Sequence, residues 1–146
     1  MAFNIRVYGI LINSKNEVLL SDERRFGKEF TKFPGGGLEE GEGIKDCLIR
    51  EFQEELELEI EVNALIYLTD FYQKSAFNFE DQIISVYYAV SAEKEDSIIT
   101  KEATFDFEGD AIESHRWKKL EELREEDLTF PIDKVVVGFL RKRRFS

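Results

Sequence analysis

Cysteine, proline and long apolar runs are scarce in this chain of 146 residues. The single cysteine, Cys47, excludes an internal disulfide framework and is expected to be a small packing residue. No apolar run approaches the ~20 residues that a membrane span requires. The N-terminal residues MAFNIRVYGI do not show a basic leader followed by a cleavage site. These absences lead us to expect a cytoplasmic protein without a membrane partner.

Positive charge is also in short supply. The chain has 20 Lys and Arg against 31 Asp and Glu, which gives a formal net charge of -11. Binding of long nucleic acid needs clustered cations that displace counterions, so this balance argues against it. A small phosphorylated substrate remains compatible with the charge, because a divalent cation reverses the local sign inside an acidic site.

The composition is that of a globular protein. Hydrophobic residues make up 42% of the chain and include 13 Phe, which argues against a disordered protein. The length falls at the common size of one domain. We therefore expect a single domain over residues 1–146.

Strand-like and helical patterns alternate along the chain without a linker, which predicts an α/β sandwich. Residues 3–12 and 18–21 are expected to form a hairpin, and a charged loop is expected over residues 22–29. The other expected strands are 30–33, 59–72, 83–90 and 103–107 paired with 111–118; the expected helices are 44–56 and one that starts at Pro131, with basic residues 141–144 at its end.

The most informative stretch is a glycine-rich turn that leads into a helix. That helix carries Glu51, Glu54 and Glu55, and positions i, i+3 and i+4 lie on one helix face. Like charges at such spacing repel one another, and a hard divalent cation bound through oxygen atoms would offset the repulsion. The alternative is a solvated acidic face on an ordinary amphipathic helix.

A second stripe on this helix favours the metal site. The apolar residues lie about 120° from the acids, which places the acids at the rim of a groove. Arg50 is expected to reach Glu54 across one helical turn and to hold it in place. The stripe consists of Leu48, Ile49, Phe52 and Leu56.

The stretch resembles the signature of the Nudix hydrolases, Gly-x5-Glu-x7-Arg-Glu-U-x-Glu-Glu-x-Gly-U, where U is a bulky aliphatic residue. Gly36 and Glu42 occupy its first two positions, and Phe52 stands in for the first U. Glu57 replaces the last glycine, which would close the helix in the left-handed conformation. Glu42 would assist at the start of the helix.

The resemblance implies the Nudix α/β/α sandwich, with a mixed β-sheet between helices. It also implies hydrolysis of a phosphoanhydride bond in a nucleoside diphosphate linked to another moiety, with Mg²⁺ or Mn²⁺ as cofactor. Carried over by position, Glu51 and Glu55 are the principal metal ligands. Glu54 is a further ligand or the base, and the Gly36 carbonyl is an additional ligand. Arg50 would position a carboxylate.

The family often draws one more acid from a later loop or strand, and Glu113, Glu108 and Asp81 are the candidates here. Glu113 ranks first, because it shares a strand face with Trp117 by period-2 alternation. The alternative for Glu113 is an exposed strand residue. His115 lies on the same face, where we expect a structural role.

Substrate contacts are expected from the glycine turn and from a basic loop. Arg24, Arg25 and Lys28 would meet phosphates, or would simply be solvated. The residues that would cradle a pyrophosphate are Gly35, Gly36 and Gly37. The aromatic residues that would stack on a base, or belong to the core, are Tyr8, Phe71, Tyr72, Phe77 and Phe79.

Two other function classes stay open. One is a Nudix-like domain that binds a nucleotide metabolite without cleaving it, and the other is an interaction module whose acidic helix binds only cations. The intact carboxylate set disfavours the first. The expected partner is a small nucleotide-type substrate, with a homodimer as an open arrangement. No proline lies between Pro34 and Pro131, so the downstream proline of the ADP-ribose branch is missing.

Overall fold

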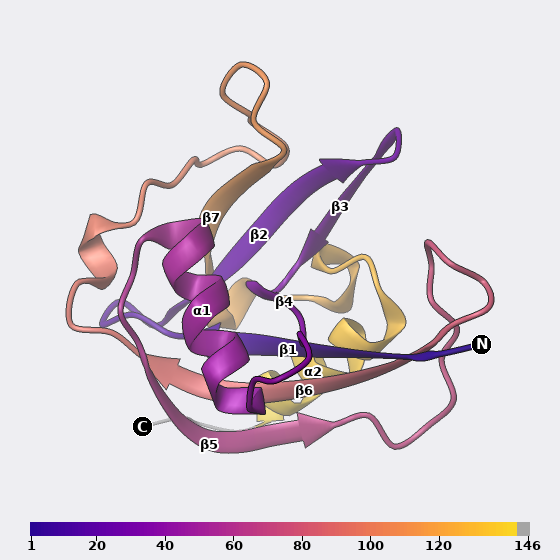
Figure 1. Cartoon of the computed structure of the whole chain (residues 1–146). Coiled ribbons are helices and arrows are strands. Elements are labelled where there is room, and N and C mark those ends of the chain that lie inside the picture. Colours follow the sequence, from indigo (N-terminus) through magenta and orange to yellow (C-terminus); the bar gives the residue numbers. More distant parts are fainter. Residues whose placement is uncertain (143–146) are drawn as a thin grey trace.

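The computed structural model describes residues 1–142, and Figure 1 shows how its elements are arranged. Arg143 and Arg144, part of the expected basic helix end, lie outside the described residues. The strands are β1 (Phe3–Leu11), β2 (Glu17–Arg25), β3 (Lys28–Lys32), β4 (Gly35–Gly37), β5 (Glu61–Leu68), β6 (Gln82–Ser91) and β7 (Glu113–Lys119); the helices are α1 (Ile44–Leu56), α2 (Pro131–Lys142) and the short 3₁₀ helices η1 (Glu95–Ser97), η2 (Leu120–Glu122) and η3 (Glu125–Asp127).

The strands form two sheets. One has the order β4-β1-β6-β5, and the other has the order β3-β2-β7. The pairing of β1 with β6 is parallel, whereas β4, β5 and the whole second sheet pair antiparallel. The mixed α/β fold expected from the sequence is therefore confirmed.

Two hydrophobic cores lie on opposite faces of these strands. The alternation of side chains along β1 sends Val7 and Leu11 to the core under α1, and sends Tyr8 and Ile10 to the core under α2. In Figure 1, α1 lies in front of the β4-β1-β6-β5 sheet and α2 lies behind it. This arrangement places the α1 carboxylates beside the edge strand β4, next to the glycine turn.

The expected hairpin of residues 3–12 and 18–21 forms only at its turn, where Ile12 makes an antiparallel bridge with Val18 and the Asn13 N–H donates to the Glu17 carbonyl at 2.9 Å. The expected pairing of the two strands beyond the turn is wrong, because β1 and β2 belong to different sheets. The reason is burial on both faces of β2: Leu19 packs in the core under α1, while Leu20 packs in the core under α2. β2 therefore forms the centre of a separate sheet.

The expected charged loop over residues 22–29 is also wrong. β2 continues to Arg25, and β3 begins at Lys28 after a two-residue turn in which Phe26 and Gly27 both have positive φ. Positive φ at both central residues is typical of a tight hairpin turn. The charges looked like a loop in the sequence, but Asp22 and Glu23 are buried.

The expected strand at residues 103–107 does not form. β7 pairs instead with β2, in a register that places Glu113 opposite Glu23. The residues between η1 and β7 are irregular, and the Arg24 guanidinium donates to the carbonyls of Gly109 (2.6 Å) and Ala111 (2.8 Å) there. No helix in residues 1–142 is both long and apolar enough to cross a membrane.

Candidate active site

The acidic helix α1 spans residues 44–56, as its sequence pattern predicted. The residue that follows and caps the helix, Glu57, has a left-handed backbone with φ 50° and ψ 40°. The Glu57 N–H donates to the Gln53 carbonyl (3.0 Å), and the Leu58 N–H donates to the Phe52 carbonyl (3.4 Å). The first bond is that of an αL cap, so the chain leaves the helix through the left-handed conformation that glycine favours.

Arg50 holds three carboxylates around one guanidinium. Its Nε and Nη2 donate to both oxygens of Glu42, at 2.9 and 2.8 Å. Its Nη1 donates to Glu51 (2.9 Å) and to Glu54 (3.0 Å), as the i, i+4 spacing predicted for Glu54. The hydrogen bonds from Arg50 lower the pKa of Glu42 to about 2. Arg50 therefore positions carboxylates on α1.

Glu51 lies directly against the glycine turn. A Cβ placed on Gly36 would come within 2.6 Å of the Glu51 carboxylate, so a larger residue there would displace the Glu51 side chain from this position. Gly36 pairs with Val7 of β1, which fixes the turn to the sheet. Gly36 and Glu51 both line the main cleft of the molecule.

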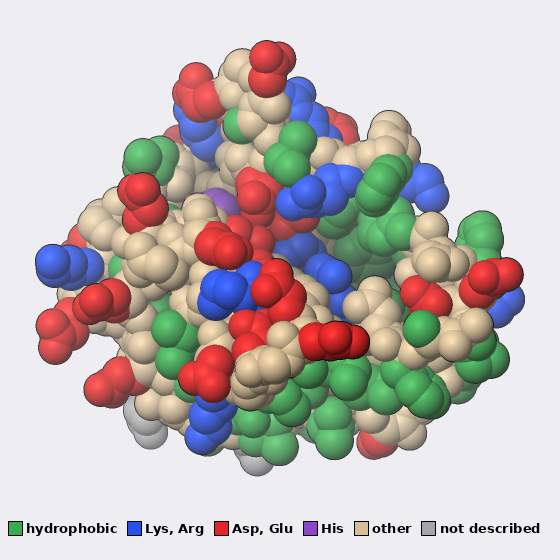
Figure 2. All heavy atoms as spheres, viewed as in Figure 1, with side chains coloured by type: hydrophobic (Ala, Val, Ile, Leu, Met, Phe, Trp, Pro, Cys, Tyr) green, Lys and Arg blue, Asp and Glu red, His purple; other side chains and the backbone are tan. Residues whose placement is uncertain are grey.

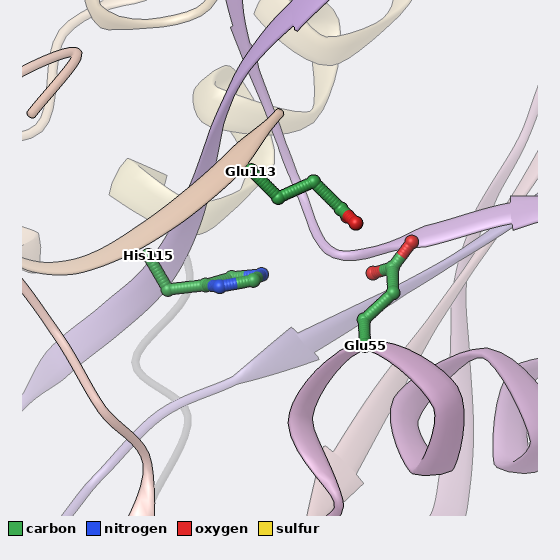
Figure 3. Close-up of side chains that lie close together, drawn as sticks. All are labelled: Glu55, Glu113 and His115. Carbon is green, nitrogen blue, oxygen red and sulfur yellow. The ribbon is translucent and has the colours of Figure 1, made fainter. Parts of the chain in front are cut away.

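Glu55, the next acid of α1, meets Glu113 and His115 of β7 (Figure 3). One ligand atom from each of these side chains lies within 4.8 Å of the others. Glu55 Oε2, Glu113 Oε2 and His115 Nε2 are buried and have no hydrogen-bond partner. Buried polar atoms without partners are rare in folded proteins, so this cluster calls for a ligand.

Burial is the main cause of the pKa shifts in this cluster, and each shift favours the uncharged form of its side chain. Burial raises the pKa of Glu55 to about 9, and the nearby carboxylates of Glu113, Glu23 and Glu51 add to the shift against the effect of Lys32. Burial and Glu23 raise the pKa of Glu113. Cation binding would reverse these shifts, because it favours the charged carboxylates.

A buried ion pair forms the floor of the cleft beside the cluster. Lys32 Nζ contacts Glu23 Oε2 at 2.8 Å and donates to the carbonyls of Phe33 (3.3 Å) and Gly35 (3.1 Å). Arg25 Nε donates to the other oxygen of Glu23 at 3.0 Å. Because Lys32 has three protons and three such partners, it holds the glycine turn in place.

The main cleft has a volume of about 400 Å³ and lies between the α1 acids and an aromatic wall. Figure 2 shows it as a hollow with blue side chains at its floor, red carboxylates on one side and green side chains on the other. Phe77 packs against Phe26 and Phe30, with ring centroids 5.4 Å apart in both pairs. The lining includes Arg6, Tyr8, Arg25, Lys32, Gly35, Gly36, Gly37, Glu51, Glu55, Phe26, Phe30, Phe77, Phe130 and Asp133.

The structure separates the remaining residues that the sequence singled out. Glu54 is 57% exposed and turns toward Arg50, outside the main cleft. Arg24 binds the 109–111 loop and packs on Phe107, so it faces away from the cleft. Among the expected aromatic residues, Tyr8 and Phe77 line the cleft, whereas Phe71, Tyr72 and Phe79 do not.

The other two candidate acids have partners of their own, although Glu108 lines a cavity together with Glu55 and Glu113. Glu108 pairs with Lys101, and Asp81 accepts hydrogen bonds from Asn78 and from the Ala2 N–H. The sequence did not reveal the Lys32–Glu23 pair, because Glu23 looked like a residue of the charged loop 22–29, whereas Lys32 belonged to the expected strand 30–33. The Phe-Gly turn between β2 and β3 was the signal that would have found it.

Solved structures of other proteins share this fold. A NUDIX hydrolase from Nitrosomonas europaea is 18% identical with a TM-score of 0.70, over 96% of this chain and 89% of that one. A MutT NUDIX hydrolase from Burkholderia pseudomallei is 17% identical with a TM-score of 0.67, over 94% and 97%. An ADP-ribose pyrophosphatase from Streptococcus suis is 15% identical with a TM-score of 0.60, over 95% and 90%. No curated protein matches the chain significantly.

A match at the level of the family agrees with the fold and with the arrangement of the α1 acids. The family model described as a NUDIX domain matches residues 2–138, which is most of the chain. The matched range contains the glycine turn, the Arg50 network and the cluster on β7. With the signature between Gly36 and Leu58 placed on a turn and a helix beside the main cleft, this chain belongs to the Nudix family.

Proposed function

We propose that this chain hydrolyses a phosphoanhydride bond in a nucleoside diphosphate linked to another moiety, with Mg²⁺ or Mn²⁺ at the α1 carboxylates. Family membership makes it a Nudix-type pyrophosphohydrolase that uses a divalent metal and a small nucleotide-type substrate. The observation that carries the proposal is the shared cleft: Glu51 and Glu55 line the same cavity as the glycine turn and Lys32. The carboxylates that would bind a metal ion and the basic side chains near the phosphates therefore line the same cleft.

The residues present fit a divalent cation. Glu55 and Glu113 each present a buried oxygen without a hydrogen-bond partner, and no described cation pairs with Glu55 within 4.0 Å. Carboxylate oxygens are the ligands that Mg²⁺ and Mn²⁺ favour. We expect Glu51 and Glu55 to hold the ion, with Glu54 and the Gly36 carbonyl as further ligands.

When bound, such a cation neutralises phosphate charge and lowers the pKa of the attacking water. Gly35, Gly36 and Gly37 would cradle the pyrophosphate, because glycine allows the closest approach of the backbone. Arg25 lies at the same cleft and supplies positive charge for the phosphate oxygens. Lys32 acts through the turn, since its three protons are already engaged.

The attacking water must lose a proton, and Glu113 is the acceptor that the geometry favours. Its buried Oε2 has no hydrogen-bond partner, and a carboxylate that binds an ion through one oxygen keeps the other oxygen to accept the proton. Glu54 is the alternative, but its Oε2 already accepts from Arg50 at 3.0 Å. The water oxygen bonds to one phosphorus as the bond to the bridging oxygen breaks, which yields two phosphorylated products.

The test is a panel of nucleoside diphosphate derivatives and nucleoside triphosphates, each with Mg²⁺ or Mn²⁺, with product identification. Hydrolysis in ¹⁸O-labelled water should place the label on one phosphate product. Simple phosphomonoesters should be poor substrates, because they offer no second phosphate for the site to bind. Efficient monoesterase activity without pyrophosphatase activity would overturn the proposal. Tight binding of a nucleotide without turnover would instead indicate a sensor.

A further inference from the structure

We propose that His115 is a metal ligand through Nε2, together with Glu55 and Glu113, and that this mixed site takes a divalent transition metal such as Mn²⁺ in preference to Mg²⁺. The inference deepens the proposed function and rests on it, because Glu55 is a ligand in both. It binds the ion with Glu51 in the proposed function, and with Glu113 and His115 here. The binding of an ion by His115 can be measured apart from any catalysis.

The three side chains converge from two elements that are distant in sequence. Glu55 projects from the last turn of α1, and Glu113 and His115 project from the same face of β7 (Figure 3). Their ligand atoms lie within 4.8 Å of one another. Two ligands on opposite sides of one ion lie about 4.2 Å apart, given bonds of about 2.1 Å. Small side-chain rotations therefore suffice to enclose an ion.

The burial of His115 is the second, independent observation. Its side chain belongs to a residue that is only 7% exposed, and Nε2 has no hydrogen-bond partner. The carboxylates of Glu55 and Glu113 belong to the same cluster but form no hydrogen bond with Nε2. A water molecule could donate to only two of the three unpartnered atoms, whereas a cation satisfies all three at once.

The cluster also has its own opening. A second cavity of about 400 Å³ is lined by Glu54, Glu55, Glu113 and His115, and also by the paired Lys101 and Glu108. Among the described residues, Glu55 alone lines both cavities. An ion can therefore reach His115 without passing through the space that the substrate would occupy.

The donor set determines which metal the site prefers. Mg²⁺ favours oxygen ligands and retains water, whereas imidazole nitrogen suits transition metals. A site with two carboxylates and one imidazole keeps enough oxygen character for Mn²⁺ and adds a nitrogen that penalises Mg²⁺. The expected consequence is a selectivity for Mn²⁺ that a purely carboxylate site would lack.

The sequence makes the decisive experiment unusually direct, because His115 is the single histidine of the chain. Untagged protein is loaded with Mn²⁺, and electron spin echo envelope modulation is recorded. A ¹⁴N coupling of the imidazole type can come only from His115, and we expect to observe it. Bound Mn²⁺ without that coupling would overturn the proposal, whatever the enzyme then hydrolyses.

His115→Gln supplies the matched variant, because its amide oxygen replaces the nitrogen donor at similar reach. The ¹⁴N coupling should disappear, and the ratio of the Mg²⁺ to the Mn²⁺ dissociation constant should fall about tenfold. An unchanged ratio would contradict the selectivity. If the variant does not fold in a thermal melt, the wild-type spectrum still decides. Hydrolysis without ¹⁴N coupling refutes this inference alone, and coupling without hydrolysis refutes the proposed function alone.

Discussion

Glu54 and Glu55 are neighbours on α1, yet they lie in opposite surroundings. Glu54 is exposed and accepts a hydrogen bond from Arg50, in a partnered set that also holds Glu42 and Glu51. Glu55 faces the interior, in an unpartnered set with Glu113 and His115. In the first set Arg50 gives every carboxylate a hydrogen-bond partner, whereas the second set has none of its own and would need a cation. Two adjacent residues of α1 thus differ in whether the protein itself supplies the partner of the carboxylate.

The largest effect is expected from Glu55→Gln, which keeps the size of the side chain and removes its charge. It tests directly whether Glu55 differs from Glu54 in function. Turnover should fall by about two orders of magnitude or more, or roughly 3 kcal/mol of transition-state stabilisation. The metal-free protein should be as stable as the parent or more so, because folding no longer has to keep a buried carboxyl group protonated at neutral pH. Glu40→Gln, an exposed change of the same charge, is the control for kcat and thermal unfolding. Full activity of Glu55→Gln would remove Glu55 from the metal site.

The buried pair on the cleft floor predicts the opposite result for stability. Lys32→Met leaves the Glu23 carboxylate buried, with only Arg25 and Ser21 as partners. The expected cost is about 3 kcal/mol of unfolding free energy, measured by urea denaturation. The double variant Lys32→Met/Glu23→Gln should recover part of that loss. A cost below about 1 kcal/mol for the single variant would show that Lys32 does not hold the floor.

The pH dependence of the unfolding free energy distinguishes the partnered set from the unpartnered set, and it requires no activity measurement. The pKa of Glu55 is about 9 in the folded chain against 4.5 as the ordinary value, so its contribution is complete below pH 4.5 and is lost as the pH rises toward 9. We expect the metal-free protein to lose stability between pH 7 and 9, and Glu55→Gln to flatten that slope. Glu42 has the opposite sign: its low pKa gives stability above pH 4.5, which is lost as the pH falls through about 2.

Denaturation of wild type, Glu55→Gln and Glu42→Gln across pH, in the presence of a chelator, checks both signs. Glu42→Gln should alter only the acid limb. A slope between pH 7 and 9 that is the same in Glu55→Gln and the wild type would assign it to other groups.

The smallest effect is expected at the helix exit. Glu57 adopts φ 50°, and a non-glycine residue in the left-handed region costs on the order of 1 kcal/mol. Glu57→Gly should therefore be neutral or stabilise the protein by up to about 1 kcal/mol in thermal unfolding. Glu59→Gly is the control, because Glu59 is exposed and its φ is not positive; it should destabilise. Clear destabilisation by Glu57→Gly would contradict the cap.

Short-range features of the site were predictable from the sequence. The bounds of α1 and the contact between Arg50 and Glu54 followed from helical spacing, because residues one turn apart are neighbours in any helix. The Nudix family followed from the signature between Gly36 and Leu58, and the family match confirms it. The roles assigned to the individual site residues, and the homodimer, stay predictions.

The sequence by itself determined the partnered set, since all of its members lie on α1 or on the turn just before it. Only the tertiary structure decided the unpartnered set, because β7 had to pair with β2 rather than with residues 103–107 to bring Glu113 and His115 against Glu55. The same pairing buried Glu23, which looked like a loop residue in the sequence. Helical contacts are fixed by local geometry, whereas sheet pairing depends on which strands bury their faces against both cores.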